Sequence, residues 1–378
     1  QKIKIPESFL IVEGTLFIVA PIFFLLLAIG PFSVLPTAAL GELTPYATWL
    51  LYPVLLQVRS KEKIISFFET ALFWGAILTV VTFCVIYLLY FLGQGDLITR
   101  INMFAHEYRL GYFGRNPLGG DGSFFFPNVY FRWTLLLIPA AILLLKGNKM
   151  KFIFVILAIF LTTSTAAILF TLVGLFWALF SNLLSGKIPK LYIKRLALLG
   201  DILLIAAFAL YFSGYGYIME FVTSKLNISS ASTSVKVGHI KSILALMSKD
   251  VVTFLFGMGV GSSFYSTGVD KAVTNVEVSH FNLMRQFGVL YALGFFLYVF
   301  ILFISLYKLD KTGRLLSIGI MTLFIAAGTN PLLISPVFFL LLVISRAYIT
   351  LYAREKRAFQ REKILIVDEV MIEHEQGV

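Results

Sequence analysis

Long apolar runs constrain this chain more than any other feature. Clear examples are residues 9–29, 67–92 and 283–307, each of which contains a single charged side chain. A hydrocarbon core about 30 Å thick is crossed by about 20 apolar residues in a helix, where every backbone polar group is paired within the segment. With 59% hydrophobic and 13% charged residues, the chain is too apolar for a water-soluble domain. The sequence therefore predicts an all-α, polytopic integral membrane protein with one membrane domain over 1–378.

The runs divide into about ten membrane-spanning helices, and into at most about twelve. Residues 152–184 are too long for one pass, and their polar centre, Thr162-Thr163-Ser164-Thr165, is the natural place for a turn between two helices. Residues 34–58 are interrupted by Pro and Gly but are apolar enough for one span. The remaining predicted spans cover residues 129–145, 196–212, 315–327 and 336–352.

The placement of lysine and arginine orients these spans. The basic clusters between the runs all fall on one side of a ten-span path, and the positive-inside rule makes that side cytoplasmic. Both termini are then cytoplasmic, and we expect the charged tail over 353–378 to be partly disordered. Two long segments face outward: residues 93–128, and residues 214–282, which we expect to contain amphipathic helices. The clusters explain the net charge of +11 better than a nucleic-acid partner does.

One amphipathic helix is predicted within the second outside segment, where Ser234 has the side chain of a helix cap. Such a helix can lie flat at a membrane surface. Its polar face would carry Lys236 and His239, which can bind an anionic group, although a solvated polar face explains this pair equally well. The apolar residues at helical spacing are Val237, Ile240, Ile243, Leu244 and Met247.

Candidate catalytic residues lie where the second outside segment enters the membrane. The chain has no Walker loop, H-E-x-x-H or G-x-S-x-G motif. If the helix has begun by Glu277, this acid shares a face with His280. A neutral imidazole accepts a proton near neutral pH, so the pair suits general acid/base chemistry. The alternative is a histidine that satisfies a loop carbonyl and an acid that is favoured by the helix dipole.

Three arginines are candidates for binding phosphate oxygens, which suit the planar fork of a guanidinium. Arg285 would lie about one turn deeper than His280, where an unpaired charge is costly. Arg115 lies in the first outside segment, and Arg132 sits just inside the following span. The alternatives are ordinary loop charge for Arg115 and snorkelling to the headgroups for Arg132.

Five short motifs follow one another along the chain: Leu161-Thr162-Thr163-Ser164-Thr165, Val237-Gly238-His239-Ile240-Lys241-Ser242, Leu255-Phe256-Gly257-Met258-Gly259, Ser279-His280-Phe281-Asn282-Leu283 and Phe287-Gly288. In this order they resemble the superfamily of O-antigen ligases and Wzy-type O-antigen polymerases. The resemblance covers most of the chain in hydropathy, but specific motifs only from Leu161 to Gly294. The family often has an arginine where this chain has Thr165 and Lys236, and lysine keeps the charge without the forked guanidinium.

The resemblance implies a GT-C-like membrane glycosyltransferase that works at the outer, periplasmic face of the bacterial cytoplasmic membrane without a metal or other cofactor. Undecaprenyl diphosphate carries the growing chain, an acceptor sugar hydroxyl attacks the anomeric carbon with inversion, and the lipid diphosphate leaves. His280 would position or deprotonate that hydroxyl, with Glu277 beside it. Substrate and diphosphate binding would fall to Arg115, Arg132, Lys236, His239, Asn282 and Arg285.

We therefore predict a polymerase of O-antigen, capsule or exopolysaccharide in the inner membrane, with membrane lipid and a chain-length regulator protein as partners. A ligase that transfers glycan to lipid A-core or to protein shares the same pattern. A transporter or flippase is the alternative of another class. It would favour ionisable residues near mid-membrane and repeated halves, whereas the ionisable residues here concentrate in the outside segments.

Overall fold

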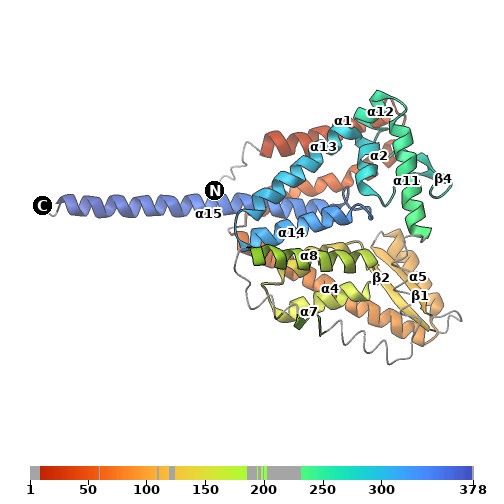
Figure 1. Ribbon diagram of the computed structural model, residues 1–378, viewed down its shortest axis with the longest axis horizontal. Helices are drawn as coiled ribbons and strands as arrows, with labels where there is room; N and C mark the ends of the chain where they lie inside the picture. The colour runs from red at the N-terminus through yellow and green to blue at the C-terminus, as the bar shows by residue number, and fades with distance from the viewer. Residues whose placement is uncertain are drawn as a thin grey trace.

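The structure is a computed structural model that describes residues 9–376 except 59, 109, 119–123, 185–193, 195–196, 199 and 202–230. The described part is mostly helical and includes two short β-hairpins (Figure 1). The predicted span over 196–212 falls almost entirely outside the described residues, and so does the beginning of the second outside segment, 214–230.

Four of the described helices are long and apolar enough to cross a membrane. They are Ile11–Ile29, α4 (Lys61–Phe91), α13 (Ser279–Tyr307) and the first part, Pro336–Glu362, of α15 (Pro336–Gln376). Shorter apolar helices cover Thr134–Leu143 and Thr165–Ser181. A mostly helical protein with membrane-length helices was predicted and is observed, whereas the total of about ten spans stays a prediction.

The polar turn within the long run 152–184 lies where the sequence predicts it. Helix α7 (Lys149–Leu161) begins after Asn148, whose side chain accepts the backbone N–H of Met150 at 2.7 Å. The chain then turns through Thr163, which has a φ of 51°, and enters α8 (Thr165–Leu184). Threonine is strained in this left-handed conformation, so the turn is held by its surroundings.

Two predicted spans are wrong in their local structure. Residues 34–58 form three short helices, α2 (Pro36–Leu43), η3 (Thr44–Leu50) and α3 (Leu51–Leu55), because prolines begin new helices instead of continuing old ones. Residues 129–145 begin as a strand and continue as η4 (Thr134–Leu136) and α6 (Leu137–Leu143).

Helix α6 forms the centre of the main core. Every residue from Leu135 to Leu145 is buried, and α6 packs against α7, α8 and α14 (Lys311–Ala326). An apolar helix of this length that is covered on all sides is a core element of the bundle, and its crossing of the membrane stays a prediction.

The first outside segment has more structure than the predicted loop. It contains α5 (Gly95–Glu107) and an antiparallel hairpin of β1 (Gly111–Leu118) and β2 (Phe124–Phe131), with Gly111 opposite Phe131. Asn102 of α5 accepts the backbone N–H of Phe113 at 2.9 Å, which fixes the helix to the hairpin. The aromatic residues of β2 have high β-propensity and were the available signal.

The second outside segment consists of α11 (Ala231–Met247), α12 (Val251–Phe256), and a hairpin of β3 (Phe264–Ser266) and β4 (Lys271–Val273). The predicted amphipathic helix exists, but its apolar stripe was only partly correct. Ile243 and Met247 are buried, whereas Val237 and Leu244 are 44% and 50% exposed. Ser234 lies inside α11 and does not cap it.

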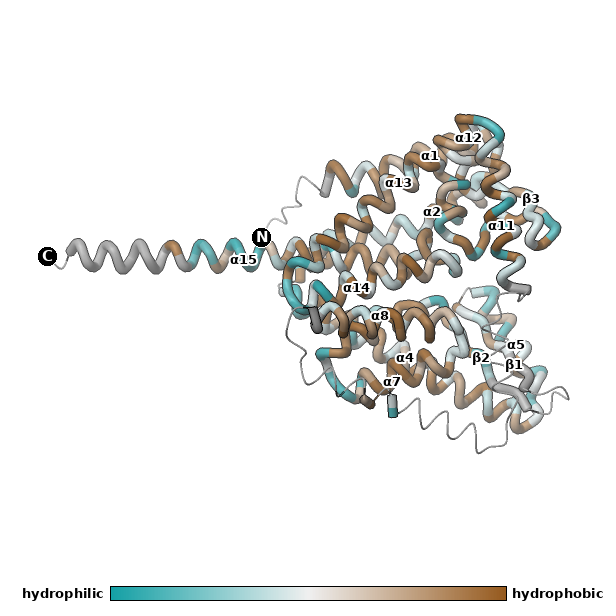
Figure 2. The backbone as a smooth tube through the Cα atoms, in the orientation of Figure 1, coloured by the Kyte–Doolittle hydropathy of each residue, from teal (hydrophilic) through white to brown (hydrophobic). Residues whose placement is uncertain are grey.

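The C-terminal tail is helical as far as Gln376, which corrects the expectation of partial disorder. Helix α15 projects from the bundle (Figure 1), and its colour changes from mostly apolar to polar as it leaves (Figure 2). Near the point of exit, Lys61 Nζ lies 2.5 Å from Glu355 Oε2, so an ion pair ties the start of α4 to α15.

Candidate functional site

The candidate site is built around the first turn of α13. This helix begins at Ser279, so Glu277 precedes it, and the condition under which Glu277 and His280 would share a helix face is not met. The Ser279 hydroxyl donates to the carbonyl of Asn330 at 2.6 Å and accepts the N–H of Leu332 at 2.7 Å. These bonds fasten the turn between α14 and α15 to the start of α13.

His280 lies in an apolar groove between α13 and α14. Its ring meets the rings of Phe324 and Phe296 edge-on, with centroids 4.8 and 5.5 Å away. The groove has a volume of about 480 Å³, and its other walls include Leu293, Leu297 and Phe300, which are all exposed on the outside of the bundle. An imidazole is therefore the polar group of a groove that is otherwise suited to a hydrocarbon chain.

A second cleft lies close to this groove and carries polar side chains on a largely apolar wall. It has a volume of about 610 Å³, and its lining combines His239, Lys271, Asn275 and Glu277 with Val235, Val269, Val273, Val276 and Pro331. The Glu277 carboxylate is 58% exposed and lies 3.1 Å from Lys236 Nζ, so the acid has a cationic partner on α11. Lys271 and Asn275 were not singled out from the sequence, although polar residues just before a long apolar run were the available signal.

Two short pieces of chain connect the groove and the cleft, although no described residue lines both. Glu277 of the cleft and His280 of the groove are three residues apart, which limits their Cα separation to about 11 Å. On the other side, Gly328 packs beside the His280 ring, and Pro331 lines the cleft. His280 therefore lies in the apolar groove, close to the charged side chains of the cleft.

Tyr130 of β2 lies within electrostatic reach of Glu277. Burial and the negative charge of Glu277 raise the pKa of Tyr130 to about 12. A hydroxyl that keeps its proton can donate a hydrogen bond at neutral pH.

His239 of α11 is held close to β3. Its Nδ1 lies 2.5 Å from Ser266 Oγ, and both side chains are buried. Burial lowers the pKa of His239, and the charge of Glu277 only partly opposes this shift. The imidazole is consequently neutral at pH 7, where it can share hydrogen bonds but brings no positive charge to an anion.

Arg285 is fully buried, and all five of its N–H groups are used within the protein. Nη1 donates to the carbonyl and the hydroxyl of Ser262 at 2.8 and 2.9 Å, and Nη2 donates to the carbonyl of Thr274 at 2.7 Å. Nε and Nη2 both donate to Asn282 Oδ1, at 3.1 and 2.9 Å. Each acceptor is neutral, so in this conformation the guanidinium supplies charge to its surroundings but has no donor left for a ligand.

Asn282 extends this arrangement, because its Nδ2 donates to Asn275 Oδ1 at 2.9 Å. Asn275 lines the cleft, and its Oδ1 also accepts the N–H of Val276 at 3.0 Å. Arg285 and Asn282 thus hold the chain between β3 and α13 in place from below. Sequence reasoning placed both residues near a ligand, whereas the structure places them beneath the wall of the cleft.

The glycine-rich motif after α12 permits a close crossing of two backbones. Gly257 and Gly288 have φ values of 78° and 77°. A Cβ on Gly257 would lie 2.6 Å from the backbone nitrogen of Gly288, and one on Gly288 would lie 2.0 Å from the carbonyl oxygen of Leu255. Only glycine fits at such a contact, where α12 ends against the kink of α13.

Arg115 and Arg132 lie in the β1–β2 hairpin and just after it. Arg132 has an exposed side chain just beyond the end of β2, two residues after Tyr130. Arg115 lies in β1 opposite Pro127, and its side chain falls outside the described part. In the described residues, no group of three or more acidic, histidine or cysteine side chains is arranged to hold a metal.

No family model matches the chain. An O-antigen polymerase from Shigella flexneri is 27% identical over 219 residues, which cover 57% of this chain and 49% of that protein. The match therefore spans about half the length of the curated relative. At this level of identity the match indicates similarity alone.

Proposed function

We propose that this chain is a membrane glycosyltransferase that polymerises polysaccharide repeat units carried on undecaprenyl diphosphate. The observation that carries the proposal is His280 in an apolar groove, close to a cleft that holds Glu277 and Lys271. A lipid-linked sugar has the same two-part chemistry, because its hydrocarbon chain belongs in lipid and its glycan belongs in water. The distant similarity to an O-antigen polymerase favours this class of substrate.

In the proposed complex, the isoprenoid chain lies along Phe296 and Phe324, and the sugars lie in the cleft. The acceptor hydroxyl attacks the anomeric carbon of the donor, a new C–O bond forms with inversion, and the bond to the diphosphate breaks. His280 accepts or orients the proton of the attacking hydroxyl. General-base assistance of this kind contributes about 10²- to 10⁴-fold in rate. Glu277, which is paired with Lys236, acts as the second candidate acid/base group.

Negative charge develops on the leaving diphosphate, so fixed positive charge near it lowers the barrier. Lys236 and Lys271 are the cations of the described outside segment that lie closest to the cleft. We propose that Lys271 contacts the diphosphate directly, whereas Arg285 contributes its buried charge and positions Asn282. Arg115 and Arg132 are retained as candidates for the same anion, from the first outside segment.

The proposed reaction takes place at the outer face of the bacterial cytoplasmic membrane, and no metal or cofactor is assigned to it. Its substrates are a donor and an acceptor that both carry lipid diphosphate. A chain-length regulator protein is a further expected partner.

The test replaces His280 with alanine in cells that depend on this protein for surface glycan. His106 of α5 is the matched control, because it is exposed and far along the chain from the site. His280→Ala should leave single repeat units and abolish the polymer ladder on a gel, whereas His106→Ala should keep the ladder. A normal ladder in His280→Ala would contradict the proposed catalytic role.

The same gel separates the alternative functions. Loss of all glycan from its final carrier, while polymer accumulates on the lipid, would favour a ligase. Loss of outward substrate movement without a change in chain length would favour a transporter.

A further inference from the structure

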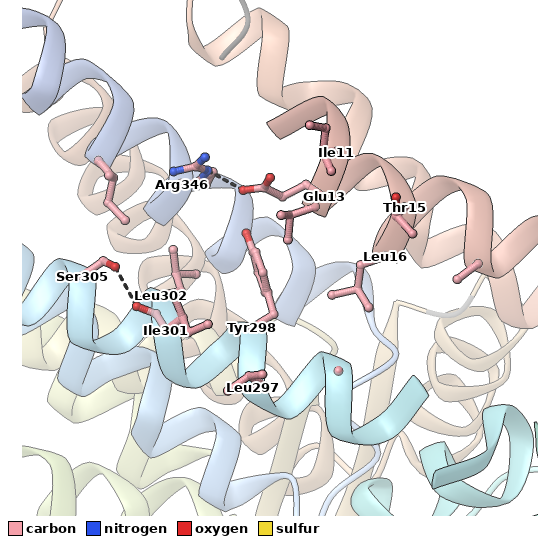
Figure 3. A pocket seen from close by; sticks show the side chains of 14 residues that line it. Ile11, Glu13, Thr15, Leu16, Leu297, Tyr298, Ile301, Leu302, Ser305 and Arg346 are labelled. Atoms are coloured by element: carbon pink, nitrogen blue, oxygen red, sulfur yellow. Dashed lines mark hydrogen bonds and ion pairs between the residues drawn. The ribbon is translucent and has the colours of Figure 1, made fainter. Parts of the chain in front are cut away.

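A buried ion pair joins the N-terminal helix to α15, away from the candidate site. Arg346 Nε lies 2.5 Å from Glu13 Oε1, and the Glu13 side chain is only 3% exposed (Figure 3). Both residues belong to candidate membrane spans. Charges in such positions are costly and mark functional sites more often than surface charges do. The proposed glycosyl transfer makes no use of this pair.

The ion pair forms the floor of a cleft between the N-terminal helix, α13 and α15. The cleft has a volume of about 580 Å³. Its rim is apolar and exposed, with Ile11 and Val12 on one side and Leu297 and Ile301 on the other. On α13 the lining runs from Gly294 to Ser305, which is about 16 Å of helix. This length and lining suit a hydrocarbon chain.

Two polar groups at the floor of the cleft are buried and paired with each other. The hydroxyl of Tyr298, whose side chain is 8% exposed and points toward Glu13 in Figure 3, donates to the Glu13 carboxylate. A carboxylate accepts several hydrogen bonds and a donating hydroxyl still has lone pairs, so both groups can accept further donors. Spare acceptors in an apolar setting favour an occupant that donates hydrogen bonds.

The N-terminal segment presents Glu13 through unusual backbone geometry. Its first two helical pieces, η1 (Phe9–Glu13) and η2 (Thr15–Val19), are π-helical. π-helical turns are rare and occur frequently at functional sites. Glu13 is the third residue of the candidate span Ile11–Ile29, which places it near the end of the hydrocarbon layer, where lipid headgroups begin.

We propose that this cleft binds a phosphatidylethanolamine molecule. The lipid head carries a primary ammonium a few bonds from a phosphate, which matches a carboxylate held beside a guanidinium. The ammonium would donate to Glu13 Oε2 and the Tyr298 hydroxyl, and the phosphate would face Arg346. One acyl chain would follow Leu297 and Ile301. Phosphatidylcholine has the same charges, but its methylated nitrogen has no N–H to donate.

The experiment uses the full-length protein in nanodiscs that contain equal amounts of phosphatidylethanolamine, phosphatidylcholine and phosphatidylglycerol. Native mass spectrometry then counts the lipids that the protein retains. We expect phosphatidylethanolamine to be retained on the order of tenfold over phosphatidylcholine, since a hydrogen bond to a charged group contributes about that factor. Partly methylated phosphatidylethanolamines should fall between the two, and this series needs no variant protein.

Variants locate the binding. Glu13→Gln and Tyr298→Phe should remove most of the preference, whereas Glu69→Gln, another acid in a candidate span, should keep it. Equal retention of ethanolamine and choline lipids by the wild-type protein would overturn the proposal, and so would an unchanged preference in both variants. Preferential retention of phosphatidylglycerol would also overturn it, because it would indicate a site for anions at Arg346.

Discussion

Replacement of Arg285 separates a residue that supports the site from one that binds substrate. Arg285→Ala would leave oxygen atoms of the buried residues Ser262 and Asn282 without donors, and would also remove the hydrogen bond to the carbonyl of Thr274, an exposed residue. Each such loss costs about 1–3 kcal/mol, although relaxation and water entry recover part of it. We therefore expect the free energy of unfolding to fall by about 3–5 kcal/mol, in the range for a broken buried polar network. Arg285→Lys restores charge but at most three donors, so it should fall between alanine and wild type.

The assay measures thermal stability in detergent together with polymer formation in cells. Arg100→Ala in α5 is the control, because this arginine is exposed and has no assigned role at the site, so its removal should change stability by less than about 0.5 kcal/mol. Loss of polymer in Arg285→Ala with unchanged thermal stability would refute the supporting role. It would indicate instead that the guanidinium exchanges its hydrogen bonds within the protein for hydrogen bonds to the diphosphate.

Three other predictions concern different parts of the site. Burial lowers the pKa of His239, so its contribution to stability is fully present above about pH 6.5 and is lost as the pH falls from there toward the lower folded-state pKa. The protection of α11 against hydrogen exchange should therefore fall over that window, and His239→Gln should abolish this change. Gly288→Ala should lower the melting temperature strongly, because its φ is positive and the new methyl group would meet a backbone carbonyl, whereas Gly294→Ala has room and should be tolerated; equal melting temperatures would contradict the crossing. Glu277→Gln should lower turnover by about 10²-fold with little change in stability, since its ion pair is largely exposed; normal turnover would remove Glu277 from the mechanism.

Local patterns of sequence were enough for several features of the fold. The polar turn near Thr163, the membrane-length helices and the helix that contains Ile243 follow from hydropathy and helical spacing. These patterns span only a few residues each, so they can be recognised in a single sequence.

Other features depend on contacts that the sequence does not reveal. Residues 135–145 are apolar because the rest of the bundle covers them, and hydropathy cannot distinguish such a helix from one that faces lipid. Arg285 is caged by oxygen atoms from Ser262 and Thr274, which precede it by 23 and 11 residues. The start of α13 at Ser279 depends on the turn between α14 and α15, so spacing alone could not show whether Glu277 lies inside the helix.

The measurement that tests the proposed activity most directly uses purified protein and a synthetic oligosaccharide on undecaprenyl diphosphate. Wild-type protein should join these repeat units into longer lipid-linked chains without any other enzyme. His280→Ala should do so about 10²-fold more slowly or worse, and His106→Ala should match the wild type. Absence of elongation by folded wild-type protein, or equal rates for wild type and His280→Ala, would contradict the assignment of His280 to glycosyl transfer.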